Sequence, residues 1–301
     1  MGTTLVVAPT DTSWFEFLKR NRNYDEINFW RPSAMGFRAL SPGGLFLFKS
    51  KTGTRGIVGG GWFSSYRLME CFLAWEVFGI GNGAESQSHM LAQIGSYKKF
   101  TGPNTKIGCI VLNFPFFFDD QPIDVPGWSP GIQQYKKYDT DTTDGRIIWD
   151  AVMDRLQPYQ MDSSVEEVVR FGQPKLVAPR VGQSTFRHDV VENYDRRCAL
   201  TRERTLPVLE AAHIKPYSKG GEHTLSNGLL LRRDIHRLFD LGYVTIDSQM
   251  KLVVSKRIRE EFENGRDYYR LGGKELWVPP VVEHQPSRES LEWHNNNCYL
   301  E

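Results

Sequence analysis

The chain has 301 residues, of which 40% are hydrophobic and 13% aromatic, and it is long enough for two domains with cores of their own. A net charge of +1 excludes a uniformly cationic surface, so affinity for nucleic acid has to come from local patches. The longest apolar run, 110–118, is too short to cross a bilayer, and the N-terminus does not resemble a signal peptide. The four cysteines form no CxxC pair, which argues against a thiolate zinc site and a disulfide framework. We expect a cytoplasmic protein that does not bind membranes.

The first half of the chain is rich in aromatic residues and is interrupted by glycines. The runs at 43–50, 56–66 and 106–118 predict β-strands, because they are apolar, aromatic and bounded by Gly or Pro. Residues 65–79 and 145–156 carry apolar side chains near helical spacing and predict helices. We therefore predict a small α+β or β-barrel domain over 1–156.

The next segment, 157–181, contains three prolines and no sustained period, which predicts a linker. A second domain is expected over 182–301. Its pattern predicts a helix at 186–197, two short strands around a turn within 198–216, and a helix that ends at Gly242. Alternating residues over 243–255 predict a hairpin, and a further helix is expected near the C-terminus.

Four polar residues of this second domain are spaced in an informative way. His213 precedes Asn227 by fourteen residues, His236 follows nine later, and Asp240 follows after four more. We place His213 on a strand, Asn227 in a loop, and the last two on one face of a helix. A histidine can take a proton from water, and a helix-borne imidazole and carboxylate can hold a divalent ion that stabilises a reacting phosphate. Asn227 is expected to tie the strand and the helix together.

The segments AAHI, NGLLL and HRLFD, with CALT upstream and SRESLEWH downstream, resemble the HNH endonuclease superfamily. The similarity is greatest to the variant found in bacterial restriction-type nucleases and extends from about residue 182 to the C-terminus. It implies a ββα-metal domain in which His213 is the general base and Asn227 is structural. It also implies that His236 and Asp240 are ligands of a divalent ion, which could be Mg²⁺, Mn²⁺, Co²⁺ or Ni²⁺.

One residue departs from that pattern. Many HNH enzymes place an Asp or His ligand directly before the general base, whereas this chain has Ala212. Either the ion rests on the two helix residues, waters and the scissile phosphate, or Glu210 supplies a further ligand. Two nearby residues are given no role in the chemistry: we expect His223 to be a solvated loop residue and Cys198 to pack without binding zinc.

The local charge around these residues favours a polyanionic substrate. Nine basic and four acidic residues lie between Arg196 and Arg237, a net charge of +5. Phosphate contact is the natural use of such a patch, and we assign it to Arg232 and Arg233. The alternative for any single arginine is an ordinary solvated face.

The N-terminal segments FWRPSAMGFRALSPGG, IVGGGWF and AWEVFG resemble PUA-like domains of the EVE type over about 14–156. The resemblance implies a small β-barrel with helices that holds a modified base flipped out of the duplex. Such a base needs aromatic faces to stack on and polar groups that read its edge. The candidates are Trp30, Trp62, Phe63 and Trp128 for stacking, Asn82 and Asp124 for the edge, and Lys49, Lys51 and Arg55 for phosphates. Each aromatic could instead be core, and the three cations could simply decorate a hairpin tip.

These features together predict a modification-dependent restriction endonuclease that acts in phage defence. Its N-terminal domain would recognise 5-methyl- or 5-hydroxymethylcytosine in double-stranded DNA, and its HNH domain would cut nearby. A homodimer with paired sites is expected, although one site could also nick each strand in turn. Two alternatives stay open: the N-terminal domain binds unmodified sequence or a protein partner, or Ala212 marks a decayed catalytic site on a protein that only reads modified DNA.

Overall fold

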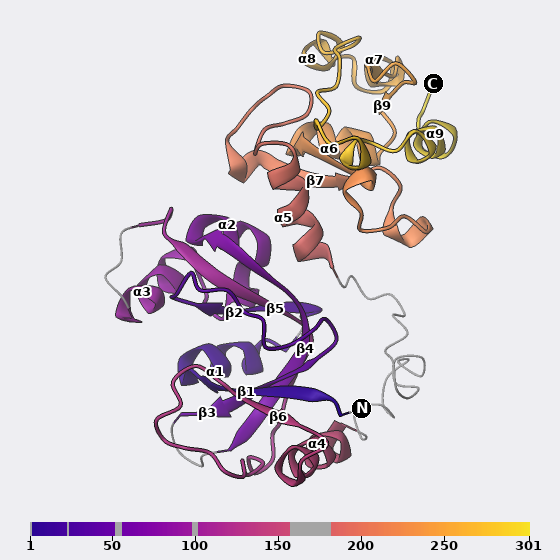
Figure 1. Ribbon diagram of the computed structural model, residues 1–301. Helices are drawn as coiled ribbons and strands as arrows, with labels where there is room; N and C mark the ends of the chain where they lie inside the picture. The colour runs from indigo at the N-terminus through magenta and orange to yellow at the C-terminus, as the bar shows by residue number, and fades with distance from the viewer. Residues whose placement is uncertain (1, 23, 52–55, 98–101, 157–181) are drawn as a thin grey trace. The chain divides into compact units, whose positions relative to one another are not determined.

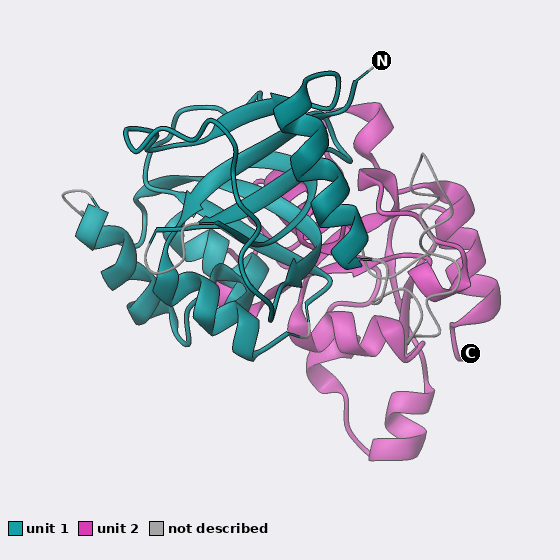
Figure 2. Cartoon of the chain, turned by 90° about the horizontal axis from the view of Figure 1, so that it is seen from below, with its two compact units in different colours: residues 1–181 teal, residues 182–301 magenta. Residues whose placement is uncertain are grey.

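The computed structural model describes residues 2–22, 24–51, 56–97, 102–156 and 182–301 (Figure 1). The chain divides into two compact units, Met1–Val181 and Gly182–Glu301, drawn in teal and magenta in Figure 2. The predicted linker, 157–181, lies outside the described residues. No helix within the described ranges is both long and apolar enough to cross a membrane.

Unit 1 is built on a mixed six-stranded sheet with the strand order β2-β5-β4-β3-β1-β6. Strands β1 and β3 run parallel, and every other neighbouring pair is antiparallel. The α+β class is thus confirmed, but the barrel is not, because β2 and β6 are left as edges among the described strands. The strands are β1 (Thr4–Thr10), β2 (Glu26–Arg31), β3 (Leu45–Ser50), β4 (Ile57–Glu70), β5 (Lys106–Phe117) and β6 (Lys136–Asp139).

Both faces of the central strands are buried. On β1 and β3, alternate side chains enter two different apolar clusters, as expected for a period of two residues. One cluster includes Val6, Phe46 and the buried side of helix α1 (Thr12–Arg20), and the other includes Leu5, Leu45 and helix α4 (Thr143–Leu156). Helices α2 (Cys71–Phe78) and α3 (Gln87–Tyr97) contribute to a third cluster beside β4 and β5.

The glycine run of β4 marks a place where neighbouring backbones approach closely. A Cβ on Gly59 would lie 2.4 Å from the Phe116 carbonyl oxygen, and one on Gly60 would lie 2.6 Å from that of Phe46. The pairing of β4 with β5 also shifts register twice just beyond this point. The strand then continues to Glu70, so the predicted helix over 65–79 is wrong over its first six residues, and α2 begins only at Cys71.

Unit 2 consists of two small hairpins surrounded by helices. β7 (Leu209–His213) pairs antiparallel with β8 (Gly228–Arg232), and α6 (Arg233–Asp240) follows β8 directly. The prediction of two strands within 198–216 is therefore wrong: only β7 lies there, and its partner comes after the fourteen-residue loop 214–227. The remaining elements are α5 (Gln183–Asn193), β9 (Val244–Ile246), β10 (Leu252–Val254), α7 (Arg257–Phe262), α8 (Arg266–Tyr269) and α9 (Arg288–Asn297).

Helix α6 ends as the sequence predicts. Gly242 has a φ of +79°, and its N–H donates to the Phe239 carbonyl oxygen while that of Tyr243 donates to the Leu238 carbonyl oxygen. A side chain is excluded at this position, because a Cβ would lie 1.9 Å from the Cys298 carbonyl oxygen. This ending sets the length of α6, and with it the position of Asp240 in its last turn.

Candidate active site

The loop between β7 and β8 is held closed by Asn227. The buried side-chain amide accepts a hydrogen bond from the Lys215 N–H through Oδ1 and donates through Nδ2 to the carbonyl oxygens of Lys215 and Glu222, each at 2.9 Å. The backbone of Asn227 also accepts a hydrogen bond from Ile214 N–H. Asn227 therefore braces this loop from within, rather than tying the strand to the helix as the sequence suggested.

Gly221 makes this bracing possible. A Cβ at that position would lie 1.9 Å from the Lys215 carbonyl oxygen and 2.9 Å from Asn227 Nδ2. Any other residue would push the loop away from the amide that holds it. Gly221 thus has a steric reason, which is close contact with the Lys215 backbone and with the buried asparagine amide.

His213 is the last residue of β7 and is partly buried. Its ring stacks on Phe186 of α5, with 3.9 Å between ring centroids and an angle of 14° between the planes. Burial, followed by the nearby charges of His223 and His236, lowers the pKa of His213 to about 4, against a smaller opposing effect of Asp240. The imidazole is thus neutral at neutral pH and has a lone pair with which to accept a proton.

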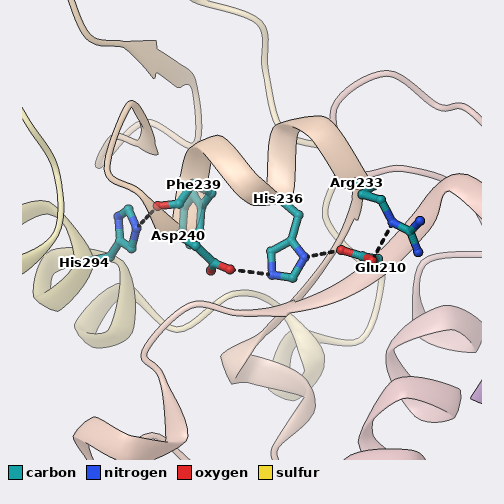
Figure 3. Close-up of polar contacts among 6 residues, drawn as sticks. All are labelled: Glu210, Arg233, His236, Phe239, Asp240 and His294. Carbon is teal, nitrogen blue, oxygen red and sulfur yellow. Dashed lines mark hydrogen bonds and ion pairs between the residues drawn. The ribbon is translucent and has the colours of Figure 1, made fainter. Parts of the chain in front are cut away.

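A row of charged groups joins β7 to α6 (Figure 3). His236 Nδ1 lies 2.8 Å from Glu210 Oε2, and His236 Nε2 lies 3.3 Å from Asp240 Oδ2. The other oxygen of Glu210 accepts a hydrogen bond from Arg233 Nε at 2.7 Å. Burial alone would lower the pKa of His236, but its hydrogen bonds and charge interactions with Asp240 and Glu210 outweigh burial and raise it.

The position before His213 is fully buried. Ala212 has no exposed surface and lies opposite Leu229 in the β7–β8 register. Glu210 is two residues earlier and points to the same side of the strand. From there its carboxylate contacts the imidazole of His236, which the sequence predicts to be a metal ligand.

The structure also locates the two arginines that were assigned to phosphate contact. Arg232 Nε donates to Asp234 Oδ1 at 3.0 Å, and Arg233 is paired with Glu210. Arg233 is nevertheless 68% exposed, so most of its guanidinium faces solvent beside the row of charged groups. Within the described part of the chain, no group of three or more His, Cys, Asp or Glu side chains is arranged to hold a metal ion.

One family model of known proteins matches the segment that contains these residues. Residues 198–247 match the family model described as HNH endonuclease. They form an HNH endonuclease domain. The matched segment of the HNH domain contains all four predicted residues, His213, Asn227, His236 and Asp240, together with Glu210.

Two solved structures are similar to larger parts of the chain. One is described as a modification-dependent TagI restriction endonuclease; it is 14% identical, with 93% of this chain and 79% of that chain covered and a TM-score of 0.34. The other is an ASCH protein from Zymomonas mobilis, 12% identical, with 48% of this chain and 94% of that chain covered and a TM-score of 0.35. No curated protein matches the chain.

The residues predicted for a base pocket in unit 1 do not come together. Adjacent residues of a strand point to opposite faces, so Phe63 enters the cluster of Val6 and Phe46, whereas Trp62 packs on the cluster of Leu5 and Leu45. Trp128 lies with Trp62 on that second cluster. The four aromatic side chains therefore do not form one cage, and one of the four, Trp30, lines a cavity.

Four other predictions for unit 1 have the following outcome. Asn82 is fully buried; Nδ2 donates to the carbonyl oxygens of Ala74 and Gly79, and Oδ1 accepts from Asn28, so the amide cannot read a base edge. Lys49 is only 5% exposed, and its ammonium lies 5.0 Å from the Trp128 ring centroid, so it is not a surface phosphate contact. Asp124 is exposed, and Arg55 lies outside the described residues.

The cavity that contains Trp30 has a volume of about 310 Å³. Its aromatic lining includes Tyr97, whose ring meets the Trp30 ring edge-on at 6.2 Å between centroids. Lys51 places its ammonium 5.3 Å from the centroid of Tyr97. The remaining lining residues are Pro9, Asp11, Trp14, Phe29, Arg31, Pro32, Ser33, Phe46, Ile110, Gln133, Gln134 and Tyr135.

Sequence reasoning missed one residue of the active site. His223 is only partly exposed: its Nδ1 lies 2.9 Å from His213 Nε2, and its ring stacks on Tyr217 with 4.6 Å between centroids. The signal that could have revealed it is its place in the loop. The segment directly before His223 is closed by Gly221 and Asn227, which limits where this side chain can go.

Proposed function

We propose that this protein is a modification-dependent DNA endonuclease, in which unit 2 hydrolyses phosphodiester bonds and unit 1 recognises a modified cytosine. The observation that carries the catalytic half is the arrangement of His213 beside the His236–Asp240 pair within the HNH domain. Metal-assisted phosphodiester hydrolysis requires a general base and groups that bind a metal ion. Here the base would be the neutral imidazole on β7, and the metal-binding groups would be the two side chains on α6.

The donor set fits a hard divalent ion held by few protein ligands. Neighbouring ligands of an octahedral ion with bonds of about 2.1 Å lie about 3 Å apart, and His236 Nε2 and Asp240 Oδ2 are 3.3 Å apart. An ionised Glu210 can only accept a hydrogen bond, so it keeps a proton on His236 Nδ1 and leaves Nε2, which faces Asp240, as the nitrogen that would bind the ion in place of its own proton. We propose His236 and Asp240 as the ligands and Glu210 as the group that orients His236.

The bound ion would stabilise the negative charge of the pentacovalent phosphate and of the leaving 3′ oxygen. The chain itself supplies the base. His213 removes a proton from water, the water oxygen forms a bond to phosphorus, and the bond from phosphorus to the 3′ oxygen breaks. A phosphate bound beside His213 would raise its pKa, because a nearby negative charge favours the imidazolium, and this makes it a stronger base when substrate is present.

For unit 1 we propose a PUA-like reader that holds an extruded base in the cavity lined by Trp30, Tyr97 and Tyr135. A volume of about 310 Å³ is within the usual range of small-ligand pockets, and the aromatic walls supply faces for stacking. Gln133 and Gln134 are exposed residues at the edge of this cavity; Gln134 Oε1 accepts a hydrogen bond from Arg31 at 2.7 Å, which leaves its Nε2 donors and the Gln133 amide to read a base edge. Lys51 beside Tyr97 is suited to contact a flanking phosphate. Because cutting a duplex needs two hydrolyses, we also propose that the protein acts as a homodimer.

The test uses the full chain with three matched duplexes that contain cytosine, 5-methylcytosine or 5-hydroxymethylcytosine at the same positions. Cleavage is measured in Mg²⁺ and in Mn²⁺, and binding is measured separately with the His213→Ala protein, so that recognition and hydrolysis are scored independently. We expect tighter binding and faster cleavage of a modified duplex. Equal binding of all three duplexes would refute the reader, and absence of cleavage in every metal would refute the nuclease.

A further inference from the structure

Two histidines of the HNH domain share a hydrogen bond. His213 Nε2 and His223 Nδ1 are 2.9 Å apart, and their ring planes meet at 63°. Because each neutral imidazole has one N–H and one lone pair, one ring donates and the other accepts. Which ring donates determines which nitrogen of His213 can take a proton from water.

The pair is held in place from both sides. Phe186 stacks against His213 at 3.9 Å, and Tyr217 stacks against His223 at 4.6 Å and an angle of 13°. The residue before His223 is fixed in addition, because the Glu222 carbonyl oxygen accepts a hydrogen bond from Asn227. The contact between the two histidines is therefore part of the packed loop, and it links the structural asparagine to the general base.

The two ring nitrogens that do not take part in this hydrogen bond, His213 Nδ1 and His223 Nε2, have different surroundings. His213 Nδ1 makes no hydrogen bond within the described part of the chain and is not one of its buried atoms, so solvent or substrate can reach it. His223 Nε2 is buried without a partner among the described residues. If His213 carried its proton on Nδ1 and accepted a hydrogen bond from His223 through Nε2, its reachable nitrogen would have no lone pair. If it donates through Nε2–H to His223, the lone pair of Nδ1 faces the reaction.

We propose that His223 is a positioning residue for the general base: its Nδ1 accepts the Nε2–H of His213 and fixes the tautomer in which His213 Nδ1 takes the proton from water. This inference rests on the proposed nuclease function. Once His213 has taken that proton, the same contact becomes a charge-assisted hydrogen bond, which is stronger than the neutral one and stabilises the imidazolium as it forms.

The experiment compares two substitutions in the full chain. His223→Asn retains an acceptor near the position of Nδ1, whereas His223→Phe retains a ring that can stack on Tyr217 but has no acceptor. His89→Phe, on helix α3 of unit 1, is the matched control, because it makes the same His-to-Phe change away from the HNH domain. The tautomer of His213 is measured by long-range ¹H–¹⁵N correlation on ¹⁵N-histidine-labelled protein, and kcat, DNA affinity and the thermal midpoint are measured on the same samples.

We expect the Nε2–H tautomer in the wild type and in His223→Asn, and a mixture of tautomers in His223→Phe. The Phe variant should lose at least about 10-fold in kcat, as part of the roughly 10²–10⁴-fold that a correctly oriented base contributes. The Asn variant should retain kcat within about 3-fold, and DNA affinity should not change in either. An Nδ1–H tautomer in the wild type, or an unchanged kcat in His223→Phe, would overturn the proposal. A wild type that cuts no DNA would instead refute the nuclease function. In that case the measured tautomer would still show whether His213 or His223 donates the hydrogen bond between them.

Discussion

Glu210 and His236 are joined by a hydrogen bond of 2.8 Å between Oε2 and Nδ1, which links β7 to α6 (Figure 3). The second carboxylate oxygen is held by Arg233 at 2.7 Å, so Glu210 cannot easily turn away. Burial would raise the pKa of Glu210, but these two partners hold it below its ordinary value, and the group stays ionised. An ionised acceptor at Nδ1 leaves Nε2 as the only nitrogen of His236 that can bind a metal.

The first prediction concerns this contact. Glu210→Gln should weaken Mn²⁺ binding in the presence of DNA by about 10–100-fold, because loss of an outer partner of a ligating histidine typically costs that much. The measurement is calorimetric titration of Mn²⁺ into a complex of the protein with uncleavable DNA. Glu222→Gln is the control, because its exposed carboxylate lies nearby in the loop and only its backbone carbonyl is used by Asn227. Equal affinities for both variants and the wild type would contradict the role of Glu210.

The second prediction concerns the base. His213→Ala should leave DNA affinity unchanged and should lower kcat by roughly 10²–10⁴-fold, because it removes the group that deprotonates water. The check is single-turnover cleavage of a modified duplex, with binding measured by fluorescence anisotropy. His284→Ala is a suitable control, because His284 lies outside the segment 198–247. Cutting by His213→Ala at the wild-type rate would show that another residue is the base.

The arrangement of the residues on helix α6 could be predicted because it depends on short-range patterns. The i and i+4 spacing of His236 and Asp240 places both on one helix face, and Gly242 ends that helix in the way a C-terminal glycine usually does. The partner strand β8 was missed, because its apolar run GLLLR is buried and does not alternate. Without β8, the asparagine was expected to join strand and helix, whereas it braces the long loop between two strands.

The contacts that could not be predicted are those set by tertiary packing. Gly221 and Asn227 limit where His223 can go, but its contact with His213 depends on Tyr217 and on the end of β7, which the local sequence does not place. In unit 1 the error was different. Trp62 and Phe63 are neighbours on one strand, so the two-residue period excludes a shared cage, and aromatic composition alone does not locate a pocket. The edge of the cavity formed by Gln133 and Gln134 lies in a segment without periodicity.

The third prediction concerns the stability of unit 2. Asn227→Ala removes three side-chain hydrogen bonds and leaves the partners in the 215–222 loop unsatisfied. These partners are part-buried, so each costs near the lower end of the about 1–3 kcal/mol of a buried unpaired group, and we expect the free energy of unfolding to fall by roughly 3 kcal/mol in total. The measurement is a urea titration that follows the transition of unit 2. Asn193→Ala, which removes a single hydrogen bond to the His284 carbonyl oxygen, should cost much less. An unchanged midpoint for Asn227→Ala would refute the bracing role.

The fourth prediction tests the reader cavity against the opposite face of the sheet. Trp30→Ala should weaken binding to modified DNA by about 5–150-fold, the equivalent of the roughly 1–3 kcal/mol that one base-stacking contact contributes. Trp128→Ala also removes a partly buried indole, but one that packs on the other apolar cluster, and should leave the preference for modified DNA unchanged. Binding of both proteins to modified and unmodified duplexes is compared by anisotropy, at a temperature well below the thermal midpoint of each variant. Equal losses of preference in the two variants would place the base elsewhere.

The last prediction concerns the missing ligand at Ala212. With His236 and Asp240 as the only protein ligands, the free protein should bind metal weakly and the complex with DNA should bind it more tightly, since the phosphate completes the coordination. Mn²⁺, Co²⁺ and Ni²⁺, which favour imidazole more than Mg²⁺ does, should support cleavage at least as well as Mg²⁺. Tight Mg²⁺ binding by the free wild type would show that a further residue, with Glu210 the first candidate, is a ligand.

Ala212→Asp separates these possibilities. Ala212 is fully buried on the side of β7 that carries Glu210, so a carboxylate at this position without a cation is costly and should lower the thermal midpoint in the absence of metal. If the site lacks a ligand here, Mn²⁺ should restore the midpoint of this variant, because a ligand that binds only the folded state stabilises it by mass action. The same Mn²⁺ concentration should barely change the midpoint of the wild type. The measurement is differential scanning fluorimetry over a Mn²⁺ series without DNA, and an equal metal response of the two proteins would mean that position 212 does not face the ion.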